Sequence, residues 1–204
     1  MCHKASDRIP YREKNMQRMF HAGCSAEEYQ SQSKGYPFPD LTGELCPHCK
    51  SGYLKKHGFY MRYLIQDGFS GILLIRRYIC KGCGHTVSLL PSFAHPGRAY
   101  GVKVIVHVLD RYYATGKRMC EIAATGVCSR QLLRWFRIRI RENLNMLVME
   151  FTKIMTLRAP PVTAGPIGKR TGQFFECIRS FTAEDISLKI FERTGKTYLS
   201  PLSR

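Results

Sequence analysis

The sequence has few acidic residues and no long apolar run. Asp and Glu together number 15, against 32 Lys and Arg, so the formal net charge is +17. No stretch reaches the roughly 18 apolar residues that a membrane-spanning helix needs, which argues against that class of protein. The first residues, Met1 to Asp7, contain no apolar signal core, so we do not expect a secreted protein.

What the chain does contain is typical of a folded protein. Hydrophobic residues make up 44% of its 204 residues, which excludes global disorder. This length suits one ordinary domain or two small ones.

The positive charge is concentrated in the middle of the chain. Residues 1–45 carry six Lys and Arg against six Asp and Glu, whereas residues 46–97 carry seven against one and residues 98–141 ten against two. A solvated face mixes both signs, so this single-sign field favours an anionic partner. Double-stranded DNA is the leading partner, with an anionic membrane surface or an acidic protein as alternatives.

Four of the nine cysteines form two closely spaced pairs. Cys46-Pro47-His48-Cys49 and Cys80-Lys81-Gly82-Cys83 are both Cys-x-x-Cys, and a strand-rich insert separates them. Each pair lets two thiolates approach one ion, and together they complete a closed tetrahedron. The spacing predicts a structural Zn²⁺ site made by Cys46, Cys49, Cys80 and Cys83; iron accepts the same ligands and stays open. Metal ligation and free thiols, in place of disulfides, indicate a reducing cytoplasm.

The insert and its flanks are predicted to form a small zinc ribbon over residues 46–97. Segments 53–65, 72–79 and 85–90 are rich in Tyr, Leu and Ile and are separated by turn residues, which predicts a three-stranded antiparallel sheet. Such a sheet buries little surface alone, so metal would supply much of its folding free energy. Its basic residues are either phosphate contacts or ordinary exposed cations: Lys55, Lys56, His57, Arg62, Arg76 and Arg77.

Residues 1–45 read as a polar N-terminal arm. Residues 12–20 favour a short helix, and Ser25-Ala26-Glu27-Glu28 resembles a helix start. A second metal site from Cys2, His3, His21 and Cys24 is disfavoured because their spacing is irregular. His48 and His85, which flank the cysteine pairs, are expected outside the ligand set.

The hydrophobic period changes from two to about three and a half after Pro96-Gly97. It predicts helices over 102–115, 118–124 and 130–143, with Ser129 as N-cap of the third and an amphipathic continuation to 155 for packing or dimerisation. The second and third form a helix-turn-helix pattern within a region of residues 98–158. Val127 stands where that motif usually has its turn glycine, and Gly126 precedes it. The positions expected to pack between the two helices are Ile122, Ala123, Cys128, Leu133 and Phe136.

The third predicted helix holds five arginines within residues 130–141, more than solubility requires. Ser129, Arg130, Gln131 and Arg134 lie at its start, where a recognition helix meets base edges in the major groove. Further along, Arg137, Arg139 and Arg141 are better placed for phosphates. A generic α-hairpin in a small helical bundle is the alternative.

Residues 159–204 read as a linker, 159–166, followed by a C-terminal helix and tail. The helix is expected over 174–193, with a possible new start at Thr182. The ending Thr194-Gly195-Lys196-Thr197 lacks the upstream glycine and strand of a phosphate loop, so it is read as a tail.

Several motifs together resemble a known family: Cys46 to Cys49, Lys56-His57-Gly58, Arg77 to Thr86 and Ser88 to Phe93. They look like a bacterial domain family of unknown function that is regarded as a transposase-like zinc-binding domain. The resemblance covers roughly residues 41–140. The order of zinc ribbon and helix-turn-helix is also similar to the N-terminal half of insertion-sequence transposases.

The catalytic half of such a transposase is not expected in this chain. A ribonuclease-H-like core needs three carboxylates on a sheet to hold two metal ions, and residues 142–204 show no long β-pattern between their acidic residues. We therefore predict no enzyme.

The sequence predicts an α+β fold and a zinc-dependent DNA-binding protein associated with a mobile genetic element. It would serve a separately encoded transposase or act as a repressor, in the cytoplasm near the nucleoid, with a homodimer as one option for its assembly. The alternatives are a zinc-ribbon adaptor that binds protein or RNA, and a truncated transposase without function.

Overall fold

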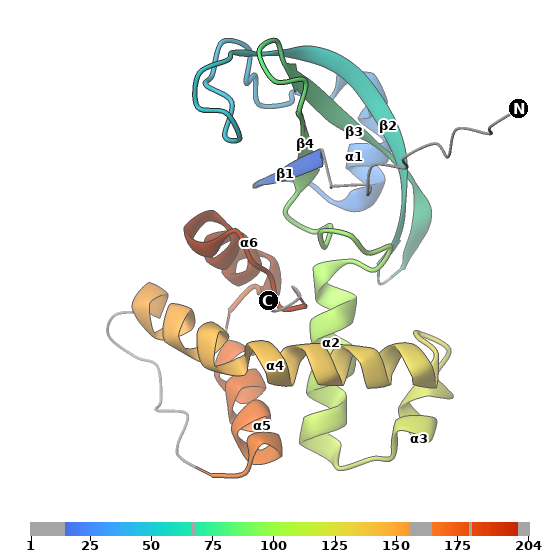
Figure 1. Cartoon of the computed structure of the whole chain (residues 1–204). Helices are drawn as coiled ribbons and strands as arrows, with labels where there is room; N and C mark the ends of the chain where they lie inside the picture. Colours follow the sequence, from blue (N-terminus) through green and yellow to red (C-terminus); the bar gives the residue numbers. More distant parts are fainter. Residues whose placement is uncertain (1–14, 67, 156–164, 180, 200–204) are drawn as a thin grey trace, which may run out of the picture.

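The computed structural model describes residues 15–66, 68–155, 165–179 and 181–199. A sheet half, which holds the four paired cysteines, stands on a helical half (Figure 1). The described part contains a four-stranded mixed sheet and six α-helices, so the fold is mixed α/β.

The sheet has the order β1-β4-β3-β2. Strands β2 (Leu54–Gln66) and β3 (Phe69–Cys80) form a long antiparallel hairpin, and β4 (Thr86–Pro91) pairs antiparallel with the end of β3. These three strands were expected from the sequence. The prediction of a three-stranded antiparallel sheet is nevertheless incomplete. The sheet has a fourth strand, β1 (Asn15–Phe20), which runs parallel to β4.

The helix predicted over residues 12–20 is wrong for the described residues 15–20. Met16, Met19 and Phe20 recur at helical spacing, but the segment is a strand whose backbone pairs with β4 from Thr86 to Pro91. Met19 is buried in the core beneath the sheet. A tertiary partner that supplies a full row of hydrogen bonds overrides a weak local preference.

The described part of the N-terminal segment is therefore packed, not a loose arm. Helix α1 (Ala26–Gln32) begins with a capping box formed by Ser25 and Glu28. Only Arg77–Ile79 of β3 pair with β4, so the rest of that strand edge is open, and α1 covers part of it. Tyr29 donates its hydroxyl to the carbonyl of Leu74, and the Gln30 amide donates to the carbonyl of Ile72. A short 3-10 helix, η1 (Ser33–Gly35), follows α1.

Three helices of the helical half follow the sequence expectation closely. They are α2 (Val102–Thr115), α3 (Met119–Ala123) and α4 (Arg130–Met155). The predicted third helix and its continuation form one helix of 26 residues, which crosses α2 and α5 (Figure 1). Its apolar residues Leu144, Leu147 and Phe151 are buried within this chain. The continuation therefore serves packing; dimerisation stays a prediction.

The C-terminal region contains two helices, α5 (Ile167–Ile178) and α6 (Ala183–Thr194). Thr182 is the N-cap of α6, so the helix does start afresh there. The expected tail is partly core, because Tyr198 and Leu199 are buried in the helical half. Most of the expected linker, residues 159–164, lies outside the described residues.

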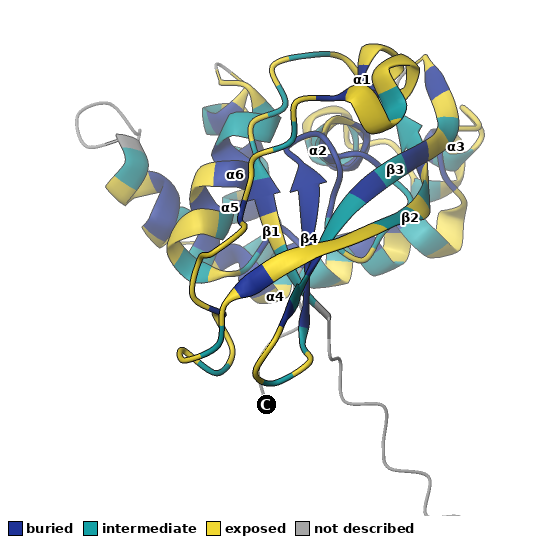
Figure 2. Ribbon diagram, turned by 90° about the horizontal axis from the view of Figure 1, so that it is seen from above, coloured by how far each residue is buried: buried dark blue, intermediate teal, exposed yellow. Residues whose placement is uncertain are grey.

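Burial is distributed unevenly over the sheet. Figure 2 shows β4 buried along its length and much of the outer strand β2 exposed. One face of β4 packs near the cysteines, with Val87 and Leu89, and Leu90 points into the core shared with α1 and α6. The cysteine pairs thus lie at one end of the sheet, away from the helices.

Candidate metal centre and nucleic-acid interface

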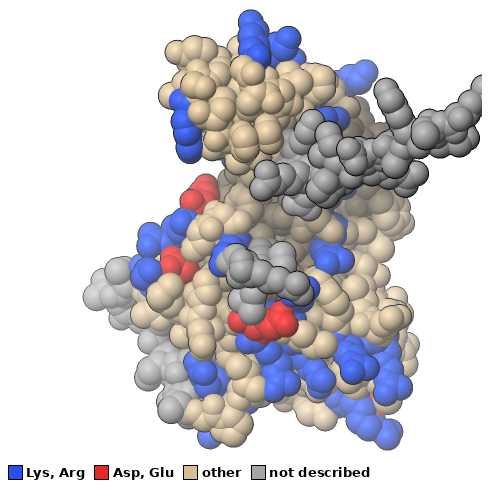
Figure 3. All heavy atoms as spheres, viewed as in Figure 1, with Lys and Arg blue, Asp and Glu red and all other residues tan. Residues whose placement is uncertain are grey.

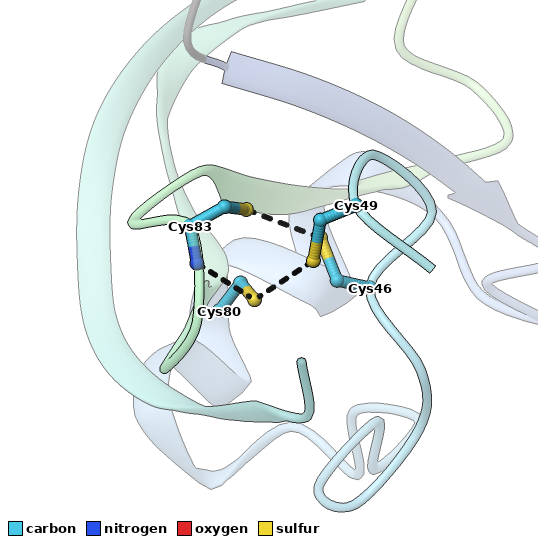
Figure 4. Close-up of side chains that lie close together, drawn as sticks. All are labelled: Cys46, Cys49, Cys80 and Cys83. Atoms are coloured by element: carbon cyan, nitrogen blue, oxygen red, sulfur yellow. Dashed lines mark hydrogen bonds between the residues drawn. The ribbon is translucent and has the colours of Figure 1, made fainter. Parts of the chain in front are cut away.

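The two cysteine pairs come together at one end of the sheet. Cys46 and Cys49 lie in the loop before β2, whereas Cys80 ends β3 and Cys83 lies in the turn before β4. Their sulfur atoms face one another (Figure 4). The Sγ atoms of Cys46 and Cys83 are 3.7 Å apart, and those of Cys49 and Cys80 are also 3.7 Å apart.

The spacing of the sulfur atoms fits a tetrahedral metal ion. All four lie within 4.8 Å of one another. A tetrahedron with metal–sulfur bonds of about 2.3 Å has sulfur–sulfur edges of about 3.8 Å. Backbone N–H groups point at the ligands: Gly52 donates to the Cys49 sulfur and Gly82 to the Cys80 sulfur, each over 3.3 Å. These four cysteines can therefore hold a metal ion, as the sequence predicted.

The surroundings of two of the thiols shift their pKa values in opposite directions. The backbone N–H groups of Ser51 and Gly52 lower the pKa of the Cys49 thiol to about 5. The N–H of His85 acts in the same direction on Cys83, but burial and the neighbouring thiols outweigh it and raise the pKa of Cys83 to about 12. A bound cation would favour the thiolate form of all four side chains.

Gly52 lies against the cysteine group, which the sequence did not predict. A Cβ at this residue would lie 2.5 Å from the Cys80 sulfur and 3.0 Å from the backbone nitrogen of Gly82. The two cysteine turns approach each other so closely that only hydrogen fits between them. The signal available in the sequence was a glycine three residues after Cys49, inside the expected ribbon.

The two histidines beside the cysteines lie outside the tetrahedron. The rings of His48 and His85 stack with centroids 3.5 Å apart, and both have a nitrogen near the Cys83 sulfur. His48 and His85 form a second possible ligand group with Cys83, beside the group of four sulfurs.

The basic residues of the strands divide between the two faces of the sheet. The pairing register puts Lys55 on the same face as Arg77, and Lys56 on the other face with Arg76. Lys56 forms an ion pair with Asp40 at 3.0 Å, and Arg76 packs over the rings of Phe59 and Tyr78. The four predicted DNA contacts on the strands therefore do not form one surface.

The segment α3-turn-α4 has the packing expected of its sequence but an altered turn. Ile122, Cys128, Leu133 and Phe136 are buried together, whereas Ala123 is only half-buried. The α3 helix has five residues, and six residues separate it from α4, more than the usual three or four.

Two local features shape the start of α4. Gly126 adopts a left-handed φ of 80°, so the turn glycine stands one residue before the usual place, and Val127 need not adopt that conformation. Ser129 caps α4 as expected, because its hydroxyl accepts from the N–H of Leu132 at 3.2 Å.

The arginines of α4 fall on two different flanks of the helix. Arg130, Arg134, Arg137 and Arg141 recur at i, i+4, i+7 and i+11, which places them in one stripe. Arg130 and Arg134 are exposed, as is Gln131 beside them. Arg137 donates to the hydroxyl of Tyr112 on α2 at 2.8 Å. We call the four residues the arginine stripe.

The surface near the arginine stripe is strongly basic. Figure 3 shows Lys and Arg gathered over the corner where α3 meets α4, at the lower right of the view. Among the described residues, no ion pair involves Arg130, Arg134 or Arg141. The exposed cations of this corner are Lys117, Arg118, Arg130 and Arg134.

Arg139 lies on the opposite flank of α4 and belongs to another cluster. It forms an ion pair with Glu142 at 2.9 Å and lies over the Trp135 ring. Arg98, from the loop between β4 and α2, stacks on the same ring with its guanidinium carbon 3.8 Å from the centroid. Sequence reasoning missed Arg98 because no local pattern connects it with Trp135.

None of the described helices is both long enough and apolar enough to cross a membrane.

Comparison with known proteins finds a family that is similar to part of this chain. Residues 46–135, from the first cysteine of the metal site to Trp135 on α4, match a domain of unknown function (DUF6431). No curated protein and no solved structure matches the chain. The chain is thus similar to this family over the metal site, the sheet hairpin with β4, α2, α3 and the start of α4.

Proposed function

We propose that the chain is a zinc-dependent DNA-binding protein in which α3 and α4 act as a helix-turn-helix. In this proposal α4 lies in the major groove, where Arg130, Gln131 and Arg134 reach base edges. Arg137 and Arg141 contact phosphates on the same side. The observation that carries the proposal is the arginine stripe, whose exposed members have no acidic partner among the described residues.

Zinc is the ion proposed for the four cysteines. Tetrahedral all-thiolate ligation and sulfur spacings of 3.7 Å suit Zn²⁺, and a closed set of four protein ligands is typical of a structural site. Zinc would stabilise the sheet half and, through the loop that carries Arg98, the position of α4.

The association with a mobile genetic element rests on the resemblance of residues 41–140 to transposase-like zinc-binding domains. The chain would recognise DNA for a separately encoded transposase, or repress transcription at the ends of the element. It would act without enzymatic activity, in the cytoplasm near the nucleoid, and a palindromic target would indicate a homodimer.

Selection of duplexes from a random pool by the zinc-loaded protein tests the proposal. We expect an enriched motif for the native protein and loss of that motif for Arg130→Ala/Arg134→Ala. Each bidentate arginine contact contributes about 1–3 kcal/mol to base discrimination, so the double variant should bind all duplexes with similar affinity.

The matched control is Lys34→Ala/Lys189→Ala, which removes the same charge from two exposed positions outside α4. It should retain the selected motif. Unchanged motif enrichment by the arginine double variant, with its zinc content intact, would exclude α4 as the reading helix.

An adaptor that docks on another protein is the second candidate. One observation favours it: Met61, Tyr63 and Ile72 are exposed by 72%, 49% and 51%, and Tyr63 and Ile72 are direct partners across β2 and β3. An adaptor would show no duplex preference in the selection. Its partner binding would weaken for Met61→Ser/Ile72→Ser and stay unchanged in the arginine double variant.

A further inference from the structure

A groove lies between the sheet and the loop that joins β4 to α2. Its volume is about 520 Å³, within the range of about 300–1,000 Å³ that is usual for ligand sites. Gln17, Ser88 and Arg77 are register partners across β1, β4 and β3, so they form one row on its floor. Residues 97–99 form the opposite wall. The groove is therefore built from five separate segments of the chain.

The groove is positively charged. Arg62, Arg77 and Arg98 line it, and no Asp or Glu is among its described lining residues. Cations gathered without an acidic partner repel one another, and a bound anion relieves that repulsion. In addition, burial and then the nearby Arg139 lower the pKa of Arg98, as expected where positive charge is crowded.

Each arginine is held in place by a group other than a carboxylate. Arg62 donates to the backbone carbonyls of His95 and Arg98. Arg77 lies over the Tyr60 ring at 5.9 Å, and Arg98 stacks on Trp135 at 3.8 Å. The guanidinium groups are thus ordered while their charge stays unneutralised, which lowers the entropic cost of binding an anion.

An aromatic residue completes the lining. Tyr60 lies in the groove on the same face of the sheet as Arg62 and Arg77, whereas the register turns the Tyr63 side chain, at the rim, to the other face. Proteins that bind single-stranded nucleic acid combine these two features, because arginines contact the phosphates and aromatic rings stack on the unpaired bases. In a base-paired duplex the bases are stacked inside the helix, so none of them can enter a groove of this size.

We propose that the groove binds an unpaired nucleotide of a DNA strand, with phosphate at Arg77 and Arg98 and the base against Tyr60. The identity of the polymer rests on the proposed function. The location is separate: Arg98 of the groove stacks on Trp135, which with Arg139 lies on the flank of α4 opposite the arginine stripe. One flank of α4 then faces duplex and the other an opened strand.

The test is fluorescence anisotropy of the full zinc-loaded chain with a labelled thymidine oligomer of about six nucleotides. Arg77→Gln removes one cation, and Gln17→Glu adds a carboxylate to the floor without removing any arginine. Both should weaken oligomer binding about tenfold, the usual scale for one charged contact. Both should keep the duplex motif, the zinc content and the melting temperature of the native protein.

The control Lys34→Gln removes an exposed charge elsewhere and should leave oligomer binding unchanged. Arg130→Ala/Arg134→Ala should do the reverse of the groove variants, losing the duplex motif and keeping the oligomer. If no duplex motif exists but oligomer binding depends on Arg77, the reading role of α4 fails and the groove stands.

Two outcomes would overturn the groove proposal. One is native oligomer affinity in both Arg77→Gln and Gln17→Glu. The other is saturable binding of thymidine monophosphate at the groove with no binding of the oligomer, which would assign it to a free nucleotide.

Discussion

The sheet half and the helical half are stabilised in different ways. The helical half has one cluster of 20 buried apolar residues, whereas the sheet half divides its buried apolar residues between clusters of 12 and 7. The smaller sheet cluster includes the metal-site cysteines Cys46 and Cys80. Because apolar burial is the main source of stability, the smallest of the three clusters is the one that gains most from a metal ion.

The two halves are connected by specific contacts. Leu188 of α6 packs in the sheet cluster, whereas Ile186 and Ile190 of the same helix pack in the helical cluster. The stacking of Arg98 on Trp135 adds a second connection, between the β4–α2 loop and α4. Loss of one half should therefore weaken the other without unfolding it.

Removal of the metal should have the largest effect and should act on the sheet half. Structural zinc contributes on the order of 10 kcal/mol of folding free energy in small domains. For Cys80→Ser we expect loss of bound zinc and of amide protection in β2, β3 and β4, while α2 and α4 keep theirs. Hydrogen exchange together with metal analysis measures both.

The control for this prediction is Cys120→Ser, at an exposed cysteine of α3. It should change neither zinc content nor protection. Full zinc and native sheet protection in Cys80→Ser would contradict the assignment of the metal site.

A cavity in the helical core should have the opposite pattern. Phe136 is fully buried between α4 and its neighbours, and truncation of such a ring costs about 3–5 kcal/mol. For Phe136→Ala we expect that loss in denaturant unfolding, with zinc still bound. Ile138→Ala, at a 44% exposed position of the same helix, is the control and should cost far less. Release of zinc by Phe136→Ala would mean that the halves unfold as one unit.

The loop between the halves should respond to acid. Burial lowers the pKa of His95 from 6.5 to about 4. As pH falls, the unfolded chain takes up this proton first, so stability is lost between pH 6.5 and pH 4, by about 3 kcal/mol in total.

The measurement is unfolding free energy against pH for the native chain and for His95→Gln. Acid also weakens metal binding by thiolates in general, so the difference between the two curves isolates His95. Parallel curves through this window would show that His95 does not contribute.

The smallest effect should come from Gly52→Ala. The added Cβ would meet the Cys80 sulfur, and the resulting strain should cost about 1–2 kcal/mol and weaken metal affinity. A chelator competition assay measures the affinity. Gly35→Ala, which has open space around it, is the control. Equal metal affinity in both variants would show that the cysteine turns have more room than their geometry indicates.

Local patterns were sufficient for much of this fold. The spacing of Cys46, Cys49, Cys80 and Cys83 predicted the group of four sulfurs, because each pair is fixed within one turn. Alternating apolar residues predicted β2, β3 and β4 within a few residues, and helical periodicity predicted α2 and α4. The start of α4 followed from Ser129, whose capping bond lies within four residues of chain.

Contacts between distant segments could not be read in this way. The strand β1 exists because β4 offers its edge about seventy residues later in the chain. The same holds for the packing of α1 on the open edge of β3 and for the stacking of Arg98 on Trp135. Their geometry depends on where other elements place the partner, and no local pattern in the sequence contains that information.

The sequence by itself determined the composition of the candidate sites: four thiols in two pairs, and five arginines on one helix. Only the tertiary structure decided on which surface each of the basic residues lies. It separated the strand cations onto two faces, moved Arg139 to the flank opposite the arginine stripe, and brought Arg62, Arg77 and Arg98 together around one groove. The physical reason is that ligand spacing and helical period are short-range properties, whereas a shared surface depends on how the sheet packs against the helices.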